Sequence, residues 1–220
     1  MSMKINDIKI GLNKPPVIIA EMSGNHNNSL DNAIELVEIA AKSGAQILKL
    51  QTYTPDTMTI NCSNQYFTIN NKKSPWHGRN LYELYGEAST PWNWHKEIIN
   101  KANKLGLETI STPFDASAVD FLEELRIPAY KIASFENNDY NLIKKICSTK
   151  KPIIMSTGLL TLSQLSETYE ILKQYSKKKF AFLKCTSNYP SNPNDSNILT
   201  ISNMREIFDC EIGLSDHTLA

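Results

Sequence analysis

Short apolar runs alternate with longer segments in which apolar residues recur every three or four positions. The short runs have the length of buried strands, and the periodic segments are typical of amphipathic helices. Strict alternation of the two is the pattern of βαβ units that share a parallel sheet. We predict strands at 17–21, 46–51, 108–111, 129–133, 152–156, 180–184 and 211–214.

Two of the intervening helices carry clear start and stop signals. Ser29 is a good N-cap for the first helix, and Gly44 is placed to end it. Thr90 followed by Pro91 predicts an N-cap and a first-turn proline for a second helix, which ends near Gly106. These capping and terminating residues support the helix boundaries that the periodicity predicts.

The number and order of the elements favour a barrel over an open sheet. A TIM barrel usually needs about 250 residues for its eight strands, and this chain has 220. We therefore expect the α/β class, with a TIM (β/α)8-type barrel that is incomplete at the C-terminus and has about seven strands. An open doubly wound sheet is the alternative. A short strand at Ile8–Ile10 is expected to form a hairpin before the barrel, and residues 1–220 are expected to form one domain.

The composition of the chain argues against nucleic acid and membranes as partners. The 23 basic and 23 acidic residues balance, so no basic excess argues for nucleic acid. No apolar run reaches about 18 residues and the N-terminus lacks a signal-peptide core, so we expect a cytoplasmic protein with no membrane partner. The cysteines lack CxxC spacing and are expected to be reduced thiols; they are Cys62, Cys147, Cys185 and Cys210.

Polar residues end each predicted strand, and the carboxyl ends of barrel strands build active sites. Lys49 and Lys131 lie within strands that are otherwise apolar. A buried ammonium needs an anionic partner or a shifted pKa. Each lysine therefore either binds an anionic ligand or pairs with a carboxylate of the core. Hydroxyls of Thr112, Ser134 and Ser156 would add donors suited to a phosphate and a carboxylate.

Two further residues leave their chemistry open. Glu21 ends the first strand, where its carboxylate could accept hydrogen bonds from a sugar, act as a base or cap the following loop. His217 follows Ser215-Asp216 after the seventh strand, and one histidine by itself makes no metal site.

The stretch between Tyr53 and Ala88 has no clear period. A loop of that length in a compact domain is usually functional. Trp76, His77 and Arg79 lie within it, and each is more often a surface or packing residue than a ligand.

Seven strings of the sequence resemble the sialic acid synthase family, in the same order along nearly the whole chain. They are IIAEMSGNHN (18–27), KLQTY (49–53), STPFD (111–115), YKIAS (130–134), STG (156–158), KCTSNYP (184–190) and GLSDHT (213–218). Within that family the segments MSGNH (22–26), LYELY (81–85), STPWNWH (89–95) and ASFEN (133–137) are most similar to the pseudaminic acid branch.

The resemblance implies a TIM barrel followed by a small antifreeze-like domain, in a domain-swapped homodimer when full length. It implies condensation of phosphoenolpyruvate with the amino-sugar aldehyde 2,4-diacetamido-2,4,6-trideoxy-L-altrose, giving pseudaminic acid and phosphate. N-acetylneuraminic or legionaminic acid synthesis is one alternative, and a truncated barrel that only binds a ligand or partner is another. The family's eighth strand, with its second metal histidine, and its antifreeze-like domain would follow Ala220.

The resemblance also implies roles for individual residues and a divalent metal, Mn²⁺ or Mg²⁺, with His217 as one ligand. Glu21 would meet the sugar, and Lys184 stands where neuraminic acid synthases usually have histidine. The residues implied to bind phosphoenolpyruvate or support its site are Lys49, Gln51, Thr112, Lys131, Ser134, Ser156, Ser187 and Tyr189, and Lys184 and Asn25 complete the expected substrate-binding set.

Overall fold

The computed structural model describes residues 3–72, 74, 76–176 and 179–219. The chain divides into two compact units. One unit is Ile18–Ala118, and the other combines Met1–Val17 with Val119–Ala220. The division falls within helix α5 (Ala116–Glu124). None of the described helices combines the length and the apolar character that crossing a bilayer requires.

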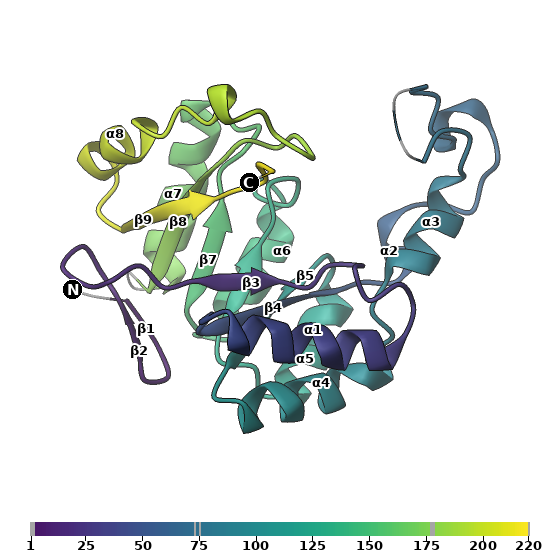
Figure 1. Ribbon diagram of the computed structural model, residues 1–220. Coiled ribbons are helices and arrows are strands. Elements are labelled where there is room, and N and C mark those ends of the chain that lie inside the picture. Colours follow the sequence, from purple (N-terminus) through teal and green to yellow (C-terminus); the bar gives the residue numbers. More distant parts are fainter. Residues whose placement is uncertain (1–2, 73, 75, 177–178, 220) are drawn as a thin grey trace. The chain divides into compact units, whose positions relative to one another are not determined.

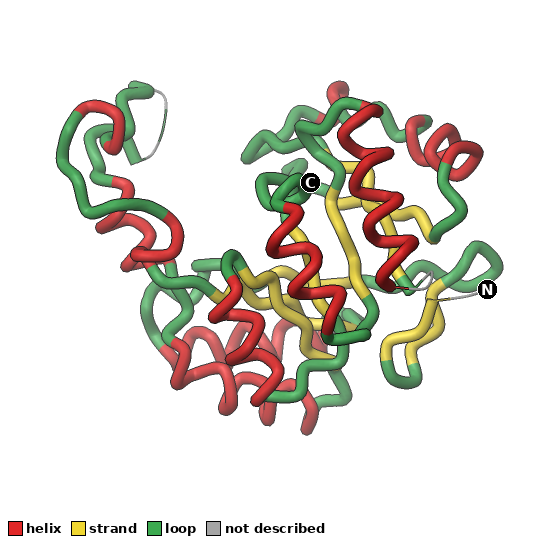
Figure 2. Tube along the Cα trace, turned by 180° about the vertical axis from the view of Figure 1, so that it is seen from behind, coloured by secondary structure: helices red, strands yellow, loops and turns green. Residues whose placement is uncertain are grey.

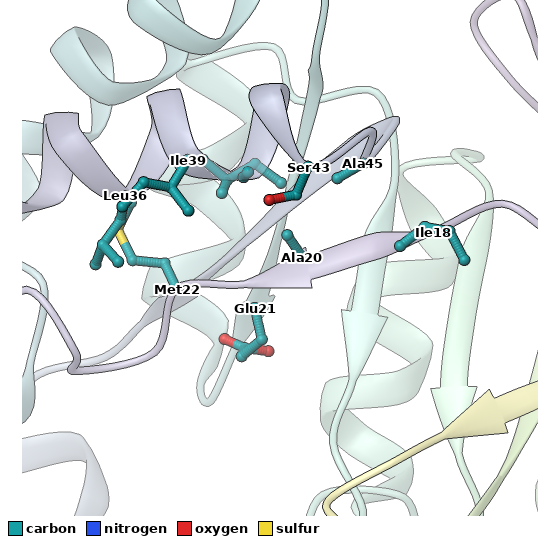
Figure 3. A pocket seen from close by; sticks show the side chains of 10 residues that line it. Ile18, Ala20, Glu21, Met22, Leu36, Ile39, Ser43 and Ala45 are labelled. Carbon is teal, nitrogen blue, oxygen red and sulfur yellow. The ribbon is translucent and has the colours of Figure 1, made fainter. Parts of the chain in front are cut away.

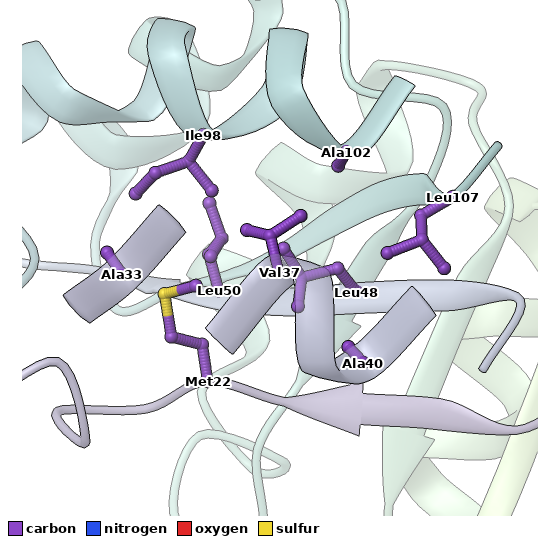
Figure 4. Packing of buried hydrophobic residues seen from close by; sticks show 9 residues of the cluster. All are labelled: Met22, Ala33, Val37, Ala40, Leu48, Leu50, Ile98, Ala102 and Leu107. Atoms are coloured by element: carbon purple, nitrogen blue, oxygen red, sulfur yellow. The ribbon is translucent and has the colours of Figure 1, made fainter. Parts of the chain in front are cut away.

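The unit Ile18–Ala118 is built on three parallel strands in the order β3 (Ile19–Glu21), β4 (Ile47–Thr52) and β5 (Glu108–Pro113). Helices α1 (Leu30–Lys42) and α4 (Trp92–Lys104) lie side by side along one face of this sheet (Figure 1). Their apolar sides and the strands enclose a core (Figure 4), which contains Met22, Ala33, Val37, Ala40, Leu48, Leu50, Ile98, Ala102 and Leu107.

Alternation along β4 separates core residues from site residues. Leu48 and Leu50 are 1 % exposed and belong to the core under the helices. Because successive side chains of a strand point to opposite faces, Lys49 and Gln51 lie on the face away from those helices. The packing of the core therefore fixes which polar side chains can reach a ligand.

The long stretch after β4 forms an arm that extends away from the sheet of this unit (Figure 1). It contains α2 (Pro55–Met58), a 3-10 turn at Gln65–Phe67 and α3 (Leu81–Ala88). Arg79 forms a 2.6 Å ion pair with Glu87 on this arm, and Trp76 is 48 % exposed. Arg79 and Trp76 therefore both lie at the surface of the arm.

The other unit contains four parallel strands in the order β6 (Tyr130–Ile132), β7 (Ile153–Ser156), β8 (Phe180–Cys185) and β9 (Glu211–Ser215). Helices α6 (Tyr140–Ser148) and α7 (Leu162–Ser176) lie side by side against these strands (Figure 2). A 3-10 turn at Pro193–Asp195 and helix α8 (Thr200–Ile207) connect β8 to β9. The predicted hairpin is confirmed as β1 (Met3–Ile5) paired with β2 (Ile8–Ile10).

The seven predicted main strands are confirmed, with ends that differ by one or two residues. Ser29 caps α1 by accepting a hydrogen bond from the Asn32 N–H, and Gly44 follows the helix with φ +85°. The start of α4 was predicted one residue too early, because Pro91 is its N-cap and the Thr90 side chain instead contacts His26. The expectation of a single domain stays a prediction.

Candidate active site

Four predicted site residues of the unit Ile18–Ala118 share one face of its sheet. Glu21 is paired in register with Lys49, and Gln51 is paired with Thr112. Figure 3 shows the Glu21 side chain on the opposite side of β3 from Ala20, which faces α1. The parallel register therefore brings these four side chains together at the carboxyl ends of their strands.

Lys49 and Glu21 form an ion pair across adjacent strands. The second oxygen of the Glu21 carboxylate accepts a hydrogen bond of 3.0 Å from the Ser23 N–H. The side chains are 14 % and 36 % exposed, so the pair is accessible from solvent on the carboxylate side. A carboxylate partner was one of the two predicted alternatives for Lys49, and Glu21 is that partner. A ligand that bound the Lys49 ammonium would therefore share this ammonium with Glu21.

Thr112 and Asn25 differ in what they offer a ligand. The Thr112 hydroxyl is buried and has no hydrogen-bond partner among the described residues. An unpaired buried hydroxyl is costly, so a ligand that accepted its hydrogen bond would relieve that cost. Asn25 is exposed, and its side-chain amide donates to the Met22 carbonyl within its own turn. The structure does not bring the Asn25 amide to the other predicted residues.

Two buried histidines hold this unit together behind the site. His95 accepts from the Thr52 hydroxyl at 2.9 Å through Nε2 and donates to the Pro91 carbonyl through Nδ1, since a carbonyl can only accept. Burial lowers the pKa of His95 to about 4. His26 contacts Thr90 at 3.1 Å, which ties the turn after β3 to the start of α4. Both histidines are structural residues in the neutral form.

A groove of about 260 Å³ lies on the helix side of β3, between that strand and α1 (Figure 3). Most of its lining is apolar, and it includes Ile18, Ala20, Leu36 and Ile39. It offers few groups that could hold a charged substrate.

In the other unit, Lys131 is 5 % exposed and is bonded to neutral groups. Its ammonium donates to the Ser156 hydroxyl at 2.6 Å and to the Ile132 carbonyl at 2.7 Å. No Asp or Glu forms a salt bridge with it among the described residues. Burial lowers the pKa of Lys131 to about 8, so most of it remains a cation at pH 7. A buried cation with a third, unused N–H is suited to an anionic ligand.

Ser134 and Ser187 line the same place around a glycine. The Ser134 hydroxyl donates to the Cys185 sulfur at 3.2 Å, and the Ser187 hydroxyl lies 3.6 Å from that sulfur. A Cβ on Gly158 would overlap the Ser187 hydroxyl oxygen and lie 2.8 Å from that of Ser134. The absence of a side chain at Gly158 therefore leaves room for both hydroxyls.

Asn137 was not among the predicted site residues, yet it positions them. Its side-chain amide donates to the carbonyls of Ser156 at 3.1 Å and Gly158 at 2.8 Å. Its own carbonyl accepts from the Thr168 hydroxyl on α7. These contacts fix the end of β7, which carries the hydroxyl bound by Lys131. Asn137 ends the ASFEN string (133–137) that resembles the family, but its contacts with Ser156 and Gly158 are distant in sequence, so only the structure shows this role.

His217 fits the role of one metal ligand. Its Nδ1 donates to the Thr186 carbonyl at 3.0 Å, which leaves the Nε2 lone pair available for coordination. The Tyr189 ring packs against the imidazole with centroids 4.3 Å apart. The described residues contain no group of three or more His, Cys, Asp or Glu side chains placed to hold a metal ion. His217 could therefore contribute to a metal site but does not constitute one.

Lys184 is the predicted site residue that the structure turns away from this group. Its ammonium donates to the Thr186 hydroxyl at 2.6 Å. Its neighbour Cys185 contacts Ser134 and Ser187 on the other face of β8. Alternation along a strand thus separates Lys184 from the hydroxyls and from the Cys185 side chain.

Comparison with known proteins gives a consistent family. The family model described as the NeuB family matches residues 36–220. A pseudaminic acid synthase of Helicobacter pylori is 45 % identical over 206 residues, which cover 94 % of this chain and 60 % of that protein. An N,N'-diacetyllegionaminic acid synthase of Campylobacter jejuni is 33 % identical over 213 residues, 93 % of this chain and 61 % of that protein. The chain thus spans about three fifths of the length of these relatives.

Solved structures agree with the fold. An N-acetylneuraminic acid (sialic acid) synthetase from Leptospira borgpetersenii, in complex with citrate, matches 99 % of this chain and 70 % of its own, with a TM-score of 0.86 and 27 % identity. A truncated 3-deoxy-D-arabino-heptulosonate 7-phosphate synthase from Thermotoga maritima matches 96 % of this chain and 67 % of its own at a TM-score of 0.66; at 15 % identity it bears on the fold alone. The α/β fold of TIM-barrel type is confirmed. From the family match and these identities, the chain belongs to the NeuB family.

Proposed function

We propose that this chain is the catalytic part of a synthase that condenses phosphoenolpyruvate with 2,4-diacetamido-2,4,6-trideoxy-L-altrose, giving pseudaminic acid and phosphate. The observation that carries the proposal is the 45 % identity to the Helicobacter pylori pseudaminic acid synthase over 94 % of this chain. The buried ammonium of Lys131, which forms no salt bridge with a described Asp or Glu, supports it, because phosphoenolpyruvate is an anion.

The proposed condensation requires that phosphoenolpyruvate, an anion, is held in a fixed position while its enol carbon reacts. Carbon three of phosphoenolpyruvate attacks the aldehyde carbon of the sugar, and water adds at carbon two before the carbon–oxygen bond to phosphate breaks. Lys131, with the hydroxyls of Ser134 and Ser156, would bind the anionic oxygens and stabilise the charge carried away by phosphate. Ser187, which lies beside the same cysteine sulfur as Ser134, would add a donor.

The residues of the unit Ile18–Ala118 would serve the same reaction. The unpaired Thr112 hydroxyl would donate to phosphoenolpyruvate, and Gln51 is its register neighbour. Glu21 would accept hydrogen bonds from sugar hydroxyls, while its ion pair with Lys49 holds the carboxylate in position.

We also propose that a divalent metal, Mn²⁺ or Mg²⁺, takes His217 as one ligand. Bound there, it would supply Lewis-acid polarisation of the aldehyde oxygen. The Thr186 carbonyl would hold the imidazole in the tautomer that coordination needs, and Tyr189 would restrict its rotation.

A second candidate is synthesis of legionaminic or N-acetylneuraminic acid. The Campylobacter jejuni legionaminic acid synthase is 33 % identical, and the mouse N-acetylneuraminate-9-phosphate synthase is 30 % identical. The higher identity to pseudaminic acid synthases favours the first candidate. The third reading is a barrel that binds ligand without turnover.

The test is to incubate the chain with phosphoenolpyruvate, Mn²⁺ and each of the three amino sugars, and to measure product mass and phosphate release. We expect the mass of pseudaminic acid from the altrose derivative, with one phosphate per product. A product only from another sugar would replace the substrate assignment. Binding of phosphoenolpyruvate without any product, for the full-length protein as well, would overturn the enzyme assignment.

A further inference from the structure

Glu136 lies next to the predicted site but takes no part in the roles assigned so far. It follows the Ser134 segment after β6, and one of its carboxylate oxygens, Oε2, is buried without a hydrogen-bond partner among the described residues. Its other hydrogen-bonding interaction is with its own backbone N–H. A buried carboxylate normally has several donors, so this group lacks the partners that would keep it ionised.

Its surroundings contain one cation and two acidic groups. Lys131 on β6 acts on it electrostatically and favours its ionised form, and Asp139 at the start of α6 opposes ionisation. The phenol of Tyr189, in the segment after β8, is also within electrostatic range. Burial is the largest influence and raises the pKa of Glu136 to about 7. The carboxyl group is thus divided between its two protonation states near neutral pH.

Binding of an anion to Lys131 changes this balance in a definite direction. The ammonium is the cation that favours the Glu136 carboxylate, and an anionic ligand would neutralise it. The added negative charge would also repel the carboxylate directly. Both effects favour the protonated form of Glu136, whose O–H can then donate a hydrogen bond.

We propose that Glu136 is a further residue of the Lys131 site, and that its carboxylate takes up a proton when phosphoenolpyruvate binds and releases it when the anion leaves. The inference rests on the proposed function, because it takes phosphoenolpyruvate as the anion bound by Lys131. It makes Glu136 a positioning residue that sets the charge of the site, and it makes substrate affinity depend on pH.

The test is calorimetry of phosphoenolpyruvate binding to the chain in buffers that differ in ionisation enthalpy. At pH 7 we expect uptake of about half a proton per anion bound, since a group with a pKa near 7 is about half protonated beforehand. Glu136→Gln, which is permanently neutral, should lose most of this uptake at pH 7 and keep only the roughly one tenth of a proton that Lys131, with its pKa of about 8, takes up. Glu206→Gln, at an exposed position of α8, should behave like the unaltered chain.

The outcomes separate the two proposals. Binding without proton uptake at pH 7, or equal uptake in the Glu136→Gln variant, would overturn the role of Glu136 and leave the proposed function standing. No binding of phosphoenolpyruvate to the unaltered chain would overturn both. Should Glu136→Gln fail to fold, ¹³C NMR of the glutamate carboxyls in the unaltered chain replaces it. A titration midpoint near pH 7 should then move up by about one unit when phosphoenolpyruvate is added, and an unmoved midpoint would contradict the proposal.

Discussion

The two lysines that lie within otherwise apolar strands show how one sequence pattern leads to two different sites. Lys49 lies beside Glu21 in the register of β3 and β4 and forms an ion pair with it. Lys131 has Ile154 as its register neighbour on β7, and its described hydrogen-bond partners are a hydroxyl and a carbonyl. The residue on the adjacent strand therefore decides whether a buried lysine is already neutralised.

The difference between the two lysines predicts which of them contributes more free energy to the binding of an anion. A ligand at Lys49 must compete with the Glu21 carboxylate. An anion at Lys131 would instead displace no salt-bridged carboxylate, and it would meet an ammonium already desolvated by the fold. We therefore expect the binding energy of phosphoenolpyruvate to depend more on Lys131 than on Lys49.

The largest expected effect comes from removing the unpaired cation. Lys131→Met should weaken phosphoenolpyruvate binding by about 3 kcal/mol or more, at least about 100-fold in Kd, because a buried charge partner of the ligand is lost. Calorimetry at fixed ionic strength measures it. Lys49→Met is the matched variant and should weaken binding less. Equal losses of phosphoenolpyruvate affinity in the two variants would contradict the proposed difference between the two lysines.

The two units should also respond in opposite directions to pH. His95 has a folded pKa of about 4 against 6.5, so its contribution to stability is present above pH 6.5 and is lost as the pH falls towards 4. Glu136 has a folded pKa of about 7 against 4.5, so it costs stability as the pH rises from 4.5 to 7. Each effect is at most about 3 kcal/mol.

Urea unfolding from pH 4.5 to 7 of the His95→Gln and Glu136→Gln variants separates the two effects. Relative to the unaltered chain, His95→Gln should lose less stability on acidification, and Glu136→Gln should gain stability at neutral pH. Variants with the same pH profile as the unaltered chain would show that neither group changes its protonation on unfolding.

A smaller effect is expected at the glycine between the two serines. Gly158→Ala should cost about 2 kcal/mol of unfolding free energy, because the added methyl group overlaps the Ser187 hydroxyl and crowds Ser134. It should also weaken phosphoenolpyruvate binding. Gly86→Ala is the control, since the nearest atom to a Cβ there is 3.9 Å away and the helix gains from alanine. Equal stability of the two variants would contradict the crowding.

Local patterns predicted the strands and the Ser29 cap, because those features depend on periodicity and on neighbours within a few residues. The Glu21–Lys49 pair depends on strand register, and the crowding at Gly158 depends on Ser134 and Ser187, which lie in other segments of the chain. Motif resemblance placed Lys184 with the other substrate-binding residues, whereas alternation along β8 turns it to Thr186. Glu136 lies in the ASFEN string (133–137) that resembles the family, but its raised pKa comes from burial, which the string does not reveal.

The most direct test of the contrast between the two lysines is a crystal structure of the chain with phosphoenolpyruvate bound. We predict a phosphate or carboxylate oxygen of the ligand within hydrogen-bonding distance of Lys131 Nζ, with the Lys49–Glu21 pair intact. Phosphoenolpyruvate bound away from Lys131, or Lys131 paired with a protein carboxylate, would contradict the account.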